Sequence, residues 1–161
     1  MFLARPQLIA SCVLLLLVPA AIAQEPSSNG ESDLVVAQLE ERVAQFLEGL
    51  SRGKVAESYT ELLRDSSLSK PAQAEALKTL IDRTRELERK YGKYRGYDRV
   101  DARRIGKDLV LLRYLYKCDE FPVVWYVTYY RDFKRSDVIA DANAWVVISV
   151  RFDTDLELLL Q

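Results

Sequence analysis

The order of two periodic patterns constrains the fold of this chain more than any other feature. Apolar residues recur every three or four positions over residues 34–53, 55–63 and 71–92. All the runs that alternate with a period of two come later, over residues 94–103, 109–118, 123–132 and 144–153. Because the two patterns are segregated and short turns join the later runs, they predict an α+β fold, with N-terminal helices packed on a curved four-stranded antiparallel sheet.

Glycine positions and strand composition refine this prediction. Gly53 and Gly92 follow helical stretches, and Gly96 falls in the first predicted strand, where a curved sheet needs a bend or bulge. Over residues 109–118 both alternating faces are largely apolar. A sheet with one face in water alternates more cleanly, so we expect a cover on the face that the helices leave open. The sequence therefore predicts a self-association surface, and a homodimer through the apolar sheet face.

The N-terminus has the pattern of a secretion signal. Arg5 precedes an apolar run over residues 8–20, and small residues at the end of that run predict cleavage between Ala23 and Gln24. The run is shorter than the roughly 20 residues of a spanning helix, so we expect no stable membrane span after cleavage. Lipidation at Cys12 is an alternative, but most of the apolar run follows that cysteine, which favours simple cleavage. The predicted location is secreted or periplasmic.

Composition divides the chain into segments and argues against nucleic acid as a partner. Beyond the signal peptide over residues 1–23, a Ser-, Glu-, Pro- and Gly-rich segment predicts a flexible tether over residues 24–33. One domain follows over residues 34–156, with a short C-terminal tail over residues 157–161. Cleavage removes one arginine and leaves 22 Lys and Arg against 24 Asp and Glu, so no basic excess favours nucleic acid. Cys118 is then the single cysteine, and no internal disulfide can form.

The absence of histidine narrows the chemistry. With no histidine in the chain, imidazole acid–base catalysis and histidine metal ligation are excluded. A carboxylate with a tyrosine is the remaining catalytic arrangement, with Asp98 or Asp101 as base and a strand tyrosine as its partner. The nine tyrosines are better explained as strand formers with an apolar ring and a polar tip. We predict no cofactor, no metal site and no catalytic residue.

Several short motifs resemble one protein family. They are residues 46–54 with the Ser58-Tyr59 pair, residues 91–94, the strand runs 112–117 and 129–131, and residues 145–150, which open with a tryptophan. Together they are similar to small exported bacterial proteins of the nuclear transport factor 2-like superfamily. The resemblance implies a cone-shaped domain with an apolar cavity between helices and sheet. The superfamily contains isomerases, dehydratases and epoxide hydrolases, and also domains that only bind or dimerise. Residues 132–143 depart from the short hairpin of the family.

These observations lead to an expected function and an alternative. The expected function is an exported, non-enzymatic module that binds a small apolar ligand or assembles with a protein partner. The alternative is a histidine-free isomerase or lyase that uses an Asp–Tyr pair in the cone on a small apolar substrate. The predicted ligand-binding side chains come from the two central strands: Arg113, Tyr114, Tyr116, Trp125 and Tyr126.

Overall fold

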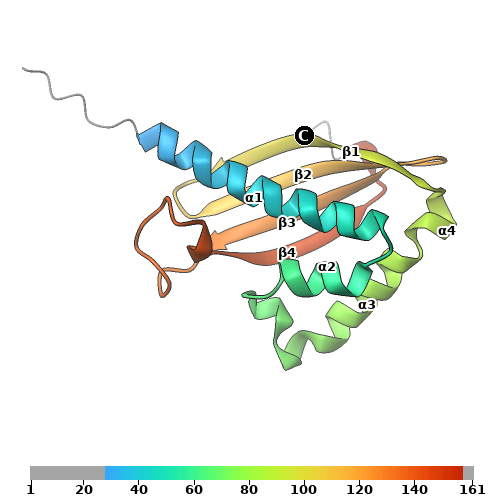
Figure 1. Ribbon diagram of the computed structural model, residues 1–161, viewed down its shortest axis with the longest axis horizontal. Helices are drawn as coiled ribbons and strands as arrows, with labels where there is room; N and C mark the ends of the chain where they lie inside the picture. Colours follow the sequence, from blue (N-terminus) through green and yellow to red (C-terminus); the bar gives the residue numbers. More distant parts are fainter. Residues whose placement is uncertain (1–27, 158–161) are drawn as a thin grey trace, which may run out of the picture.

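The computed structural model describes residues 28–157, and these residues form an α+β fold. Figure 1 shows the helices on one face of a single sheet. The helices are α1 (Ser28–Ser51), α2 (Val55–Leu62), α3 (Ala74–Arg85) and α4 (Leu87–Tyr91). The strands are β1 (Tyr94–Ile105), β2 (Leu109–Cys118), β3 (Val123–Arg131) and β4 (Trp145–Asp153), antiparallel in the order β1-β2-β3-β4. The prediction of helices packed on a four-stranded antiparallel sheet is confirmed.

The predictions for the chain ends are only partly covered by the described residues. The signal peptide, its cleavage site after Ala23 and Cys12 lie outside residues 28–157, as do residues 158–161 of the C-terminal tail. Helix α1 begins at Ser28, so residues 28–33 of the predicted tether are helical. Across residues 28–157, no helix has the length and the apolar composition that a membrane crossing requires.

An apolar stripe on α1 attaches this helix to the sheet. The buried side chains follow helical spacing and form one face of the helix: Val35, Leu39, Val43, Phe46, Leu47 and Leu50. Near its end α1 passes close to α2 at Gly49, where a Cβ atom would lie 2.0 Å from the Ser58 hydroxyl oxygen. A side chain at position 49 would therefore displace the Ser58 hydroxyl at this contact between α1 and α2.

The third predicted helix is divided in two. The stretch 71–92 begins as a 3₁₀ turn, continues as α3 and breaks at Glu86 before α4, so the prediction of one continuous helix is wrong. Thr84 lies just before the break, and its hydroxyl donates to the carbonyl of Leu80, at 2.8 Å. Such a bond back to the preceding turn often bends a helix. The bend directs Leu87 into the core, where its side chain is buried.

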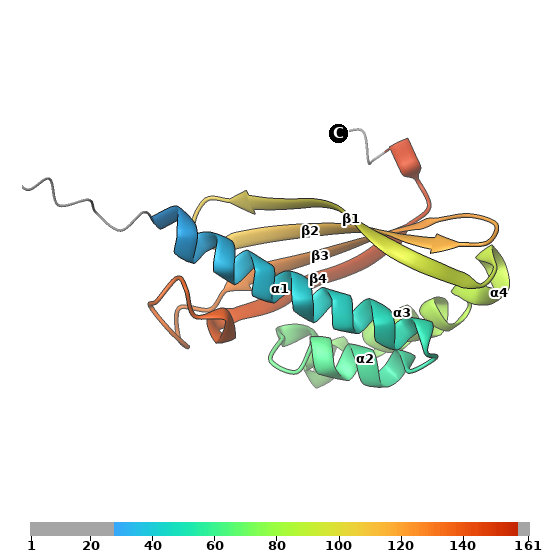
Figure 2. The ribbon, with the colours of Figure 1, turned by 45° about the horizontal axis from the view of Figure 1, so that its top comes forward.

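The two faces of the sheet differ in their cover. Over residues 109–117 of β2 the side chains facing the helices are buried and those facing away are half-buried, in strict alternation. Strand β3 is buried on both faces over residues 123–127. Figure 2 shows the described chain leaving β4 on the side opposite the helices. Register shifts at Gly96, between Arg99 and Asp101, and between Thr128 and Tyr129 curve the sheet, which confirms the bulge predicted at Gly96.

The connection between β3 and β4, residues 132–144, is long and well bonded. Arg131 closes its start, donating to the Asp108 carboxylate at 2.8 Å and to the carbonyl of Asp137 at 3.0 Å. The indole nitrogen of Trp145 donates to the carbonyl of Ile139 at 3.2 Å. Arg135 pairs with Asp65 at 3.2 Å, which ties the connection to the turn after α2. These bonds hold the connection in place, and residues 142–144 lie next to α1.

Candidate functional site

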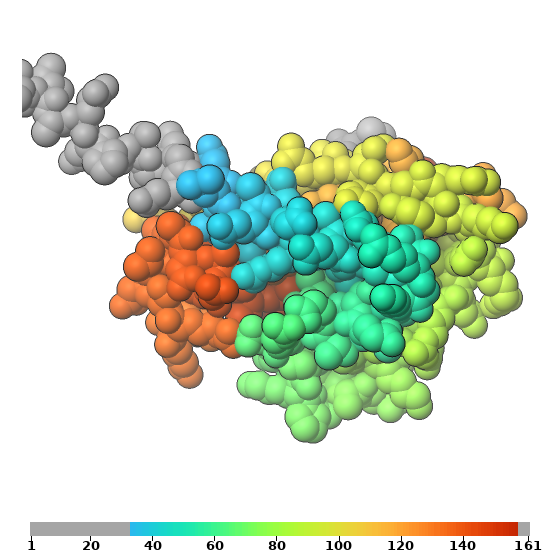
Figure 3. Space-filling view, in the orientation of Figure 1, coloured from blue at the N-terminus to red at the C-terminus, as the bar shows by residue number. Residues whose placement is uncertain are grey.

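A cavity of about 360 Å³ lies between α1, α2 and the start of β4. In Figure 3 it appears as a hollow between the cyan helix α1 and the green segment after α2, with red atoms of β4 at its floor. The lining combines apolar side chains, such as Phe46 and Val147, with charged side chains from both helices. Its volume falls in the range of small-molecule sites.

Arg42 enters this cavity from α1 and is held by main-chain oxygens. Its guanidinium donates to the carbonyl of Trp145 at 3.2 Å and to that of Ala142 at 2.9 Å. Ala142 opens the 3₁₀ turn at residues 142–144, and Trp145 directly follows it. The Asp141 carboxylate caps this turn by accepting a hydrogen bond from the backbone amide of Asn143 at 2.9 Å. The two carbonyls face α1 and fix the direction of the Arg42 guanidinium.

The charge of Arg42 is not matched by a carboxylate within residues 28–157, because none of the ion pairs found there includes it. Two of its five N–H groups are used by the two carbonyls. The side chain is half-buried, so its charge acts in a region partly shielded from water. Arg42 is therefore an oriented positive charge at the cavity.

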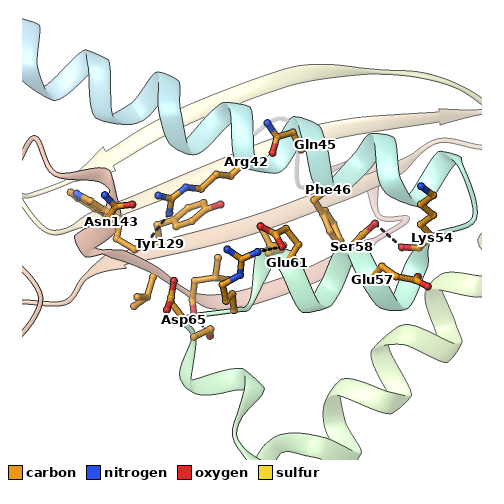
Figure 4. Close-up of a pocket in the computed structure, with 16 residues that line it drawn as sticks. Arg42, Gln45, Phe46, Lys54, Glu57, Ser58, Glu61, Asp65, Tyr129 and Asn143 are labelled. Carbon is orange, nitrogen blue, oxygen red and sulfur yellow. Dashed lines mark hydrogen bonds and ion pairs between the residues drawn. The ribbon is translucent and has the colours of Figure 1, made fainter.

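Tyr129 supplies a buried hydroxyl beside this charge. Its side chain is 1% exposed and lines the cavity, and its hydroxyl has no hydrogen-bond partner among the described residues. Burial raises the pKa of Tyr129, an effect that the charge of Arg42 reduces, so the hydroxyl keeps its proton. Figure 4 shows the Tyr129 ring beside the Arg42 guanidinium. A buried hydroxyl without a partner is unfavourable, and an acceptor in the cavity would remove that penalty.

Acidic groups from α2 and the following turn line the other side of the cavity. Glu61 pairs with Arg64, and Asp65 pairs with Arg135, so these two carboxylates are already partnered. Figure 4 places Glu61 and Asp65 on the α2 side, across from Arg42 and Tyr129. The site therefore has a donor-rich side at α1 and the sheet, and a carboxylate-rich side at α2.

The five side chains predicted to bind a ligand are divided between the two faces of the sheet. Tyr114, Tyr116 and Trp125 are buried beneath the helices. Arg113 and Tyr126 are cross-strand partners on the opposite face. Within residues 28–157 none of the five lines the α1–α2–β4 cavity. The structure thus does not bring them together as one site.

Each of these side chains has local packing. The Tyr114 hydroxyl donates to the carbonyl of Glu40 at 3.4 Å. Tyr116 lines a second cavity, of about 380 Å³, and stacks on Tyr94 with ring centroids 4.6 Å apart. The Trp125 ring lies 5.3 Å from that of Phe46.

On the outer face, Arg113 pairs with Asp101 at 2.9 Å, and the Arg151 guanidinium lies 4.1 Å from the centre of the Tyr126 ring. Asp98, the other predicted base, pairs with Lys117 at 3.0 Å on the same face. Both aspartates are therefore separated by the sheet from Tyr114 and Tyr116. Among the described residues there is no group of three or more His, Cys, Asp or Glu side chains that could hold a metal ion.

Sequence reasoning missed Arg42 and did not select Tyr129. Arg42 lies directly before Val43 of the apolar stripe on α1 and resembles an ordinary charged residue at the edge of that stripe. Tyr129 is one of nine tyrosines, and the parity of β3 places it on the same face as Trp125. That parity was a usable signal for burial, but no pattern in the sequence linked Tyr129 to Arg42. Searches of protein-family models, curated proteins and solved structures find no match to this chain.

Proposed function

We propose that this chain is a non-enzymatic binding protein whose ligand is a small molecule held in the α1–α2–β4 cavity. The Tyr129 hydroxyl carries the proposal, because it is buried at this cavity without a hydrogen-bond partner among the described residues. An unsatisfied buried hydroxyl costs about 1–3 kcal/mol, which a bound acceptor would recover. Unfavourable groups of this kind are expected at functional sites.

We propose a binding role without catalysis. Asp98 and Asp101 lie on the outer face in ion pairs, away from the cavity, so the Asp–Tyr alternative lacks support in this geometry. The helix-over-sheet architecture supports the resemblance to the nuclear transport factor 2-like superfamily, which we keep as a proposal. Export likewise follows from the N-terminal pattern of the sequence, and we propose that the chain acts in a secreted or periplasmic setting.

Assembly through the outer sheet face is a second candidate function. A row of apolar side chains crosses all four strands at one end of this face: Ile105, Leu109, Tyr130 and Val146. Ile105 is 47% exposed and Tyr130 is 40% exposed, and Phe133 contacts Tyr130 from the adjoining loop. This row supports a homodimer contact, which would be compatible with ligand binding on the other side of the sheet.

Native mass spectrometry of the chain, expressed with its own N-terminus and purified after export, tests both functions. We expect a bound species of a few hundred daltons, which Tyr129→Phe reduces. Tyr126→Phe is the matched control, since the Tyr126 hydroxyl is also buried without a described partner but lies on the outer face. Equal loss of the bound species in both variants would contradict the cavity as the site.

The same spectra report the assembly state. If the outer row forms a dimer, Ile105→Lys shifts the mass to the monomer. Phe121→Lys, at an apolar position 39% exposed and away from the row, leaves the dimer intact. A wild-type monomer at micromolar concentration contradicts the assembly function and leaves the cavity function standing.

A further inference from the structure

We infer that the ligand of the α1–α2–β4 cavity carries a single carboxylate, which the Arg42 guanidinium and the Tyr129 hydroxyl bind together. The inference rests on the proposed small-molecule site and specifies the chemical class that the site accepts. Arg42 and Tyr129 come from α1 and β3 and both line this cavity. The two side chains are near enough for the Arg42 charge to act on the Tyr129 hydroxyl.

The two groups select for a negatively charged acceptor. A guanidinium has donors and no acceptor, so Arg42 can only bind an oxygen or another acceptor. The Tyr129 hydroxyl keeps its proton because burial raises its pKa, and it has that proton to donate. Hydrogen bonds from a charged donor to a carboxylate are about twice as strong as neutral ones. Together, the two donors favour the ionised acid over its neutral amide.

The hydroxyl of Tyr129 is closed from bulk water. An acceptor therefore reaches it only when side chains that line the cavity adjust, as interface rotamers commonly do on binding. Gln45 is an exposed lining residue whose amide bonds only to Glu41, four positions earlier on α1, among the described residues.

The charge of the lining limits the ligand to one negative charge. Cations and carboxylates are present in equal number: Arg42, Lys54 and Arg64 against Glu57, Glu61 and Asp65. A phosphate dianion would meet the three carboxylates with no cationic excess to offset them. A monocarboxylate needs only the oriented charge of Arg42, whose guanidinium forms no ion pair with a carboxylate within residues 28–157.

The rest of the ligand is apolar. Phe46 is 3% exposed and is fixed by edge-on contacts with Tyr59 at 5.0 Å and Trp125 at 5.3 Å, so it gives the cavity a rigid apolar wall. Leu62, Trp145 and Val147 add to that wall. A short aliphatic or aromatic acid would place its carboxylate at Arg42 and its hydrocarbon against Phe46.

Titrations of the exported chain, followed by amide chemical shifts in NMR, test this inference. The probes are hexanoate and benzoate, their amides, and hexyl phosphate. We expect the acids to shift residues of α1, α2 and the start of β4, and to bind at least about tenfold more tightly than the amides. Tyr129→Phe should weaken acid binding several-fold, while Tyr126→Phe leaves it unchanged.

Tyr129→Phe is the deciding variant, because it removes only a hydroxyl, whereas replacing Arg42 also frees two carbonyls of the neighbouring turn. Amides that bind as tightly as the acids, or tighter binding of hexyl phosphate, would each overturn the carboxylate inference, and shifts at the cavity would then leave the proposed function intact. Equal effects of the two tyrosine variants would overturn the carboxylate inference and the cavity as the site together. If no probe shifts the cavity residues and no molecule co-purifies, the proposed function fails as well.

Discussion

The substitution of tyrosine by phenylalanine can be compared at two buried sites, one where the hydroxyl has a hydrogen-bond partner and one where it has none among the described residues. Tyr59 is fully buried, and its hydroxyl lies 3.0 Å from the Thr84 hydroxyl oxygen. Tyr129 is equally buried, and its hydroxyl has no partner among the described residues. We expect Tyr59→Phe to destabilise the protein and Tyr129→Phe to leave it unchanged or make it more stable.

The expected magnitudes follow from the bonds. The Thr84 hydroxyl donates to the carbonyl of Leu80, so Tyr59 is the donor in its bond to Thr84. Tyr59→Phe then removes one neutral hydrogen bond and leaves the proton of Thr84 satisfied, a loss of about 1 kcal/mol. Tyr129→Phe removes the unfavourable burial of a hydroxyl, a gain on the order of 1 kcal/mol. The two variants should therefore differ by about 2 kcal/mol in the free energy of unfolding.

Equilibrium unfolding in urea, followed by tryptophan fluorescence, measures this difference. Trp125 and Trp145 are both buried, so their emission reports the loss of the core. A difference of about 2 kcal/mol is well above the error of a shift in midpoint at constant slope. If Tyr129→Phe loses as much stability as Tyr59→Phe, the Tyr129 hydroxyl has a partner in the free protein, such as a bound water. The argument for an open acceptor site would then be refuted.

Two further predictions concern the fold. Gly49→Ala should lower the free energy of unfolding by about 1 kcal/mol, because a Cβ atom would lie 2.0 Å from the Ser58 hydroxyl oxygen. In a Ser58→Gly background the same change should raise the free energy of unfolding, since alanine favours a helix more than glycine does. Urea unfolding of the wild type, the two single variants and the double variant checks this. Backbone amides of Asp155 and Thr154 lower the pKa of the Asp153 carboxyl, so its contribution is present above about pH 4 and is lost as the pH falls through the lower folded pKa. Asp153→Asn should therefore be less stable than the wild type at pH 7, and a difference in urea midpoint that stays constant down to pH 2.5 would contradict this.

Much of the fold was predictable because its signals are local. Strand β2 runs from Leu109 to Cys118, the bounds that the alternation predicted, since every second side chain is fixed by burial beneath the helices. The helical spacing on α1 predicted its buried stripe in the same way. The break at Glu86 was not predictable, because it coincides with a hydrogen bond from Thr84 that competes with regular helix geometry and that no spacing rule reveals.

The cavity site was not predictable, because it depends on contacts between distant segments. Arg42 and Tyr129 are brought together by the turn at residues 142–144, whose carbonyls orient the guanidinium. The sequence marked residues 132–143 as a departure from a short hairpin, but not where their carbonyls point. Strand parity could have improved the prediction of the ligand-binding side chains, since adjacent residues such as Arg113 and Tyr114 must face opposite sides of a sheet.

Strand β3 shows why the Tyr129 hydroxyl indicates function more strongly than other buried polar atoms. Three buried side-chain atoms among the described residues have no hydrogen-bond partner, and all three belong to this strand: the Trp125 indole nitrogen and the hydroxyls of Tyr126 and Tyr129. All three atoms are closed from bulk water, so each is unfavourable in the free protein. Trp125 is packed between the rings of Phe46 and Phe152, at 5.3 and 4.9 Å, and Tyr126 lies on the outer face. Tyr129 alone of the three lines the α1–α2–β4 cavity, so it is the one that a ligand there can satisfy while the core keeps its packing.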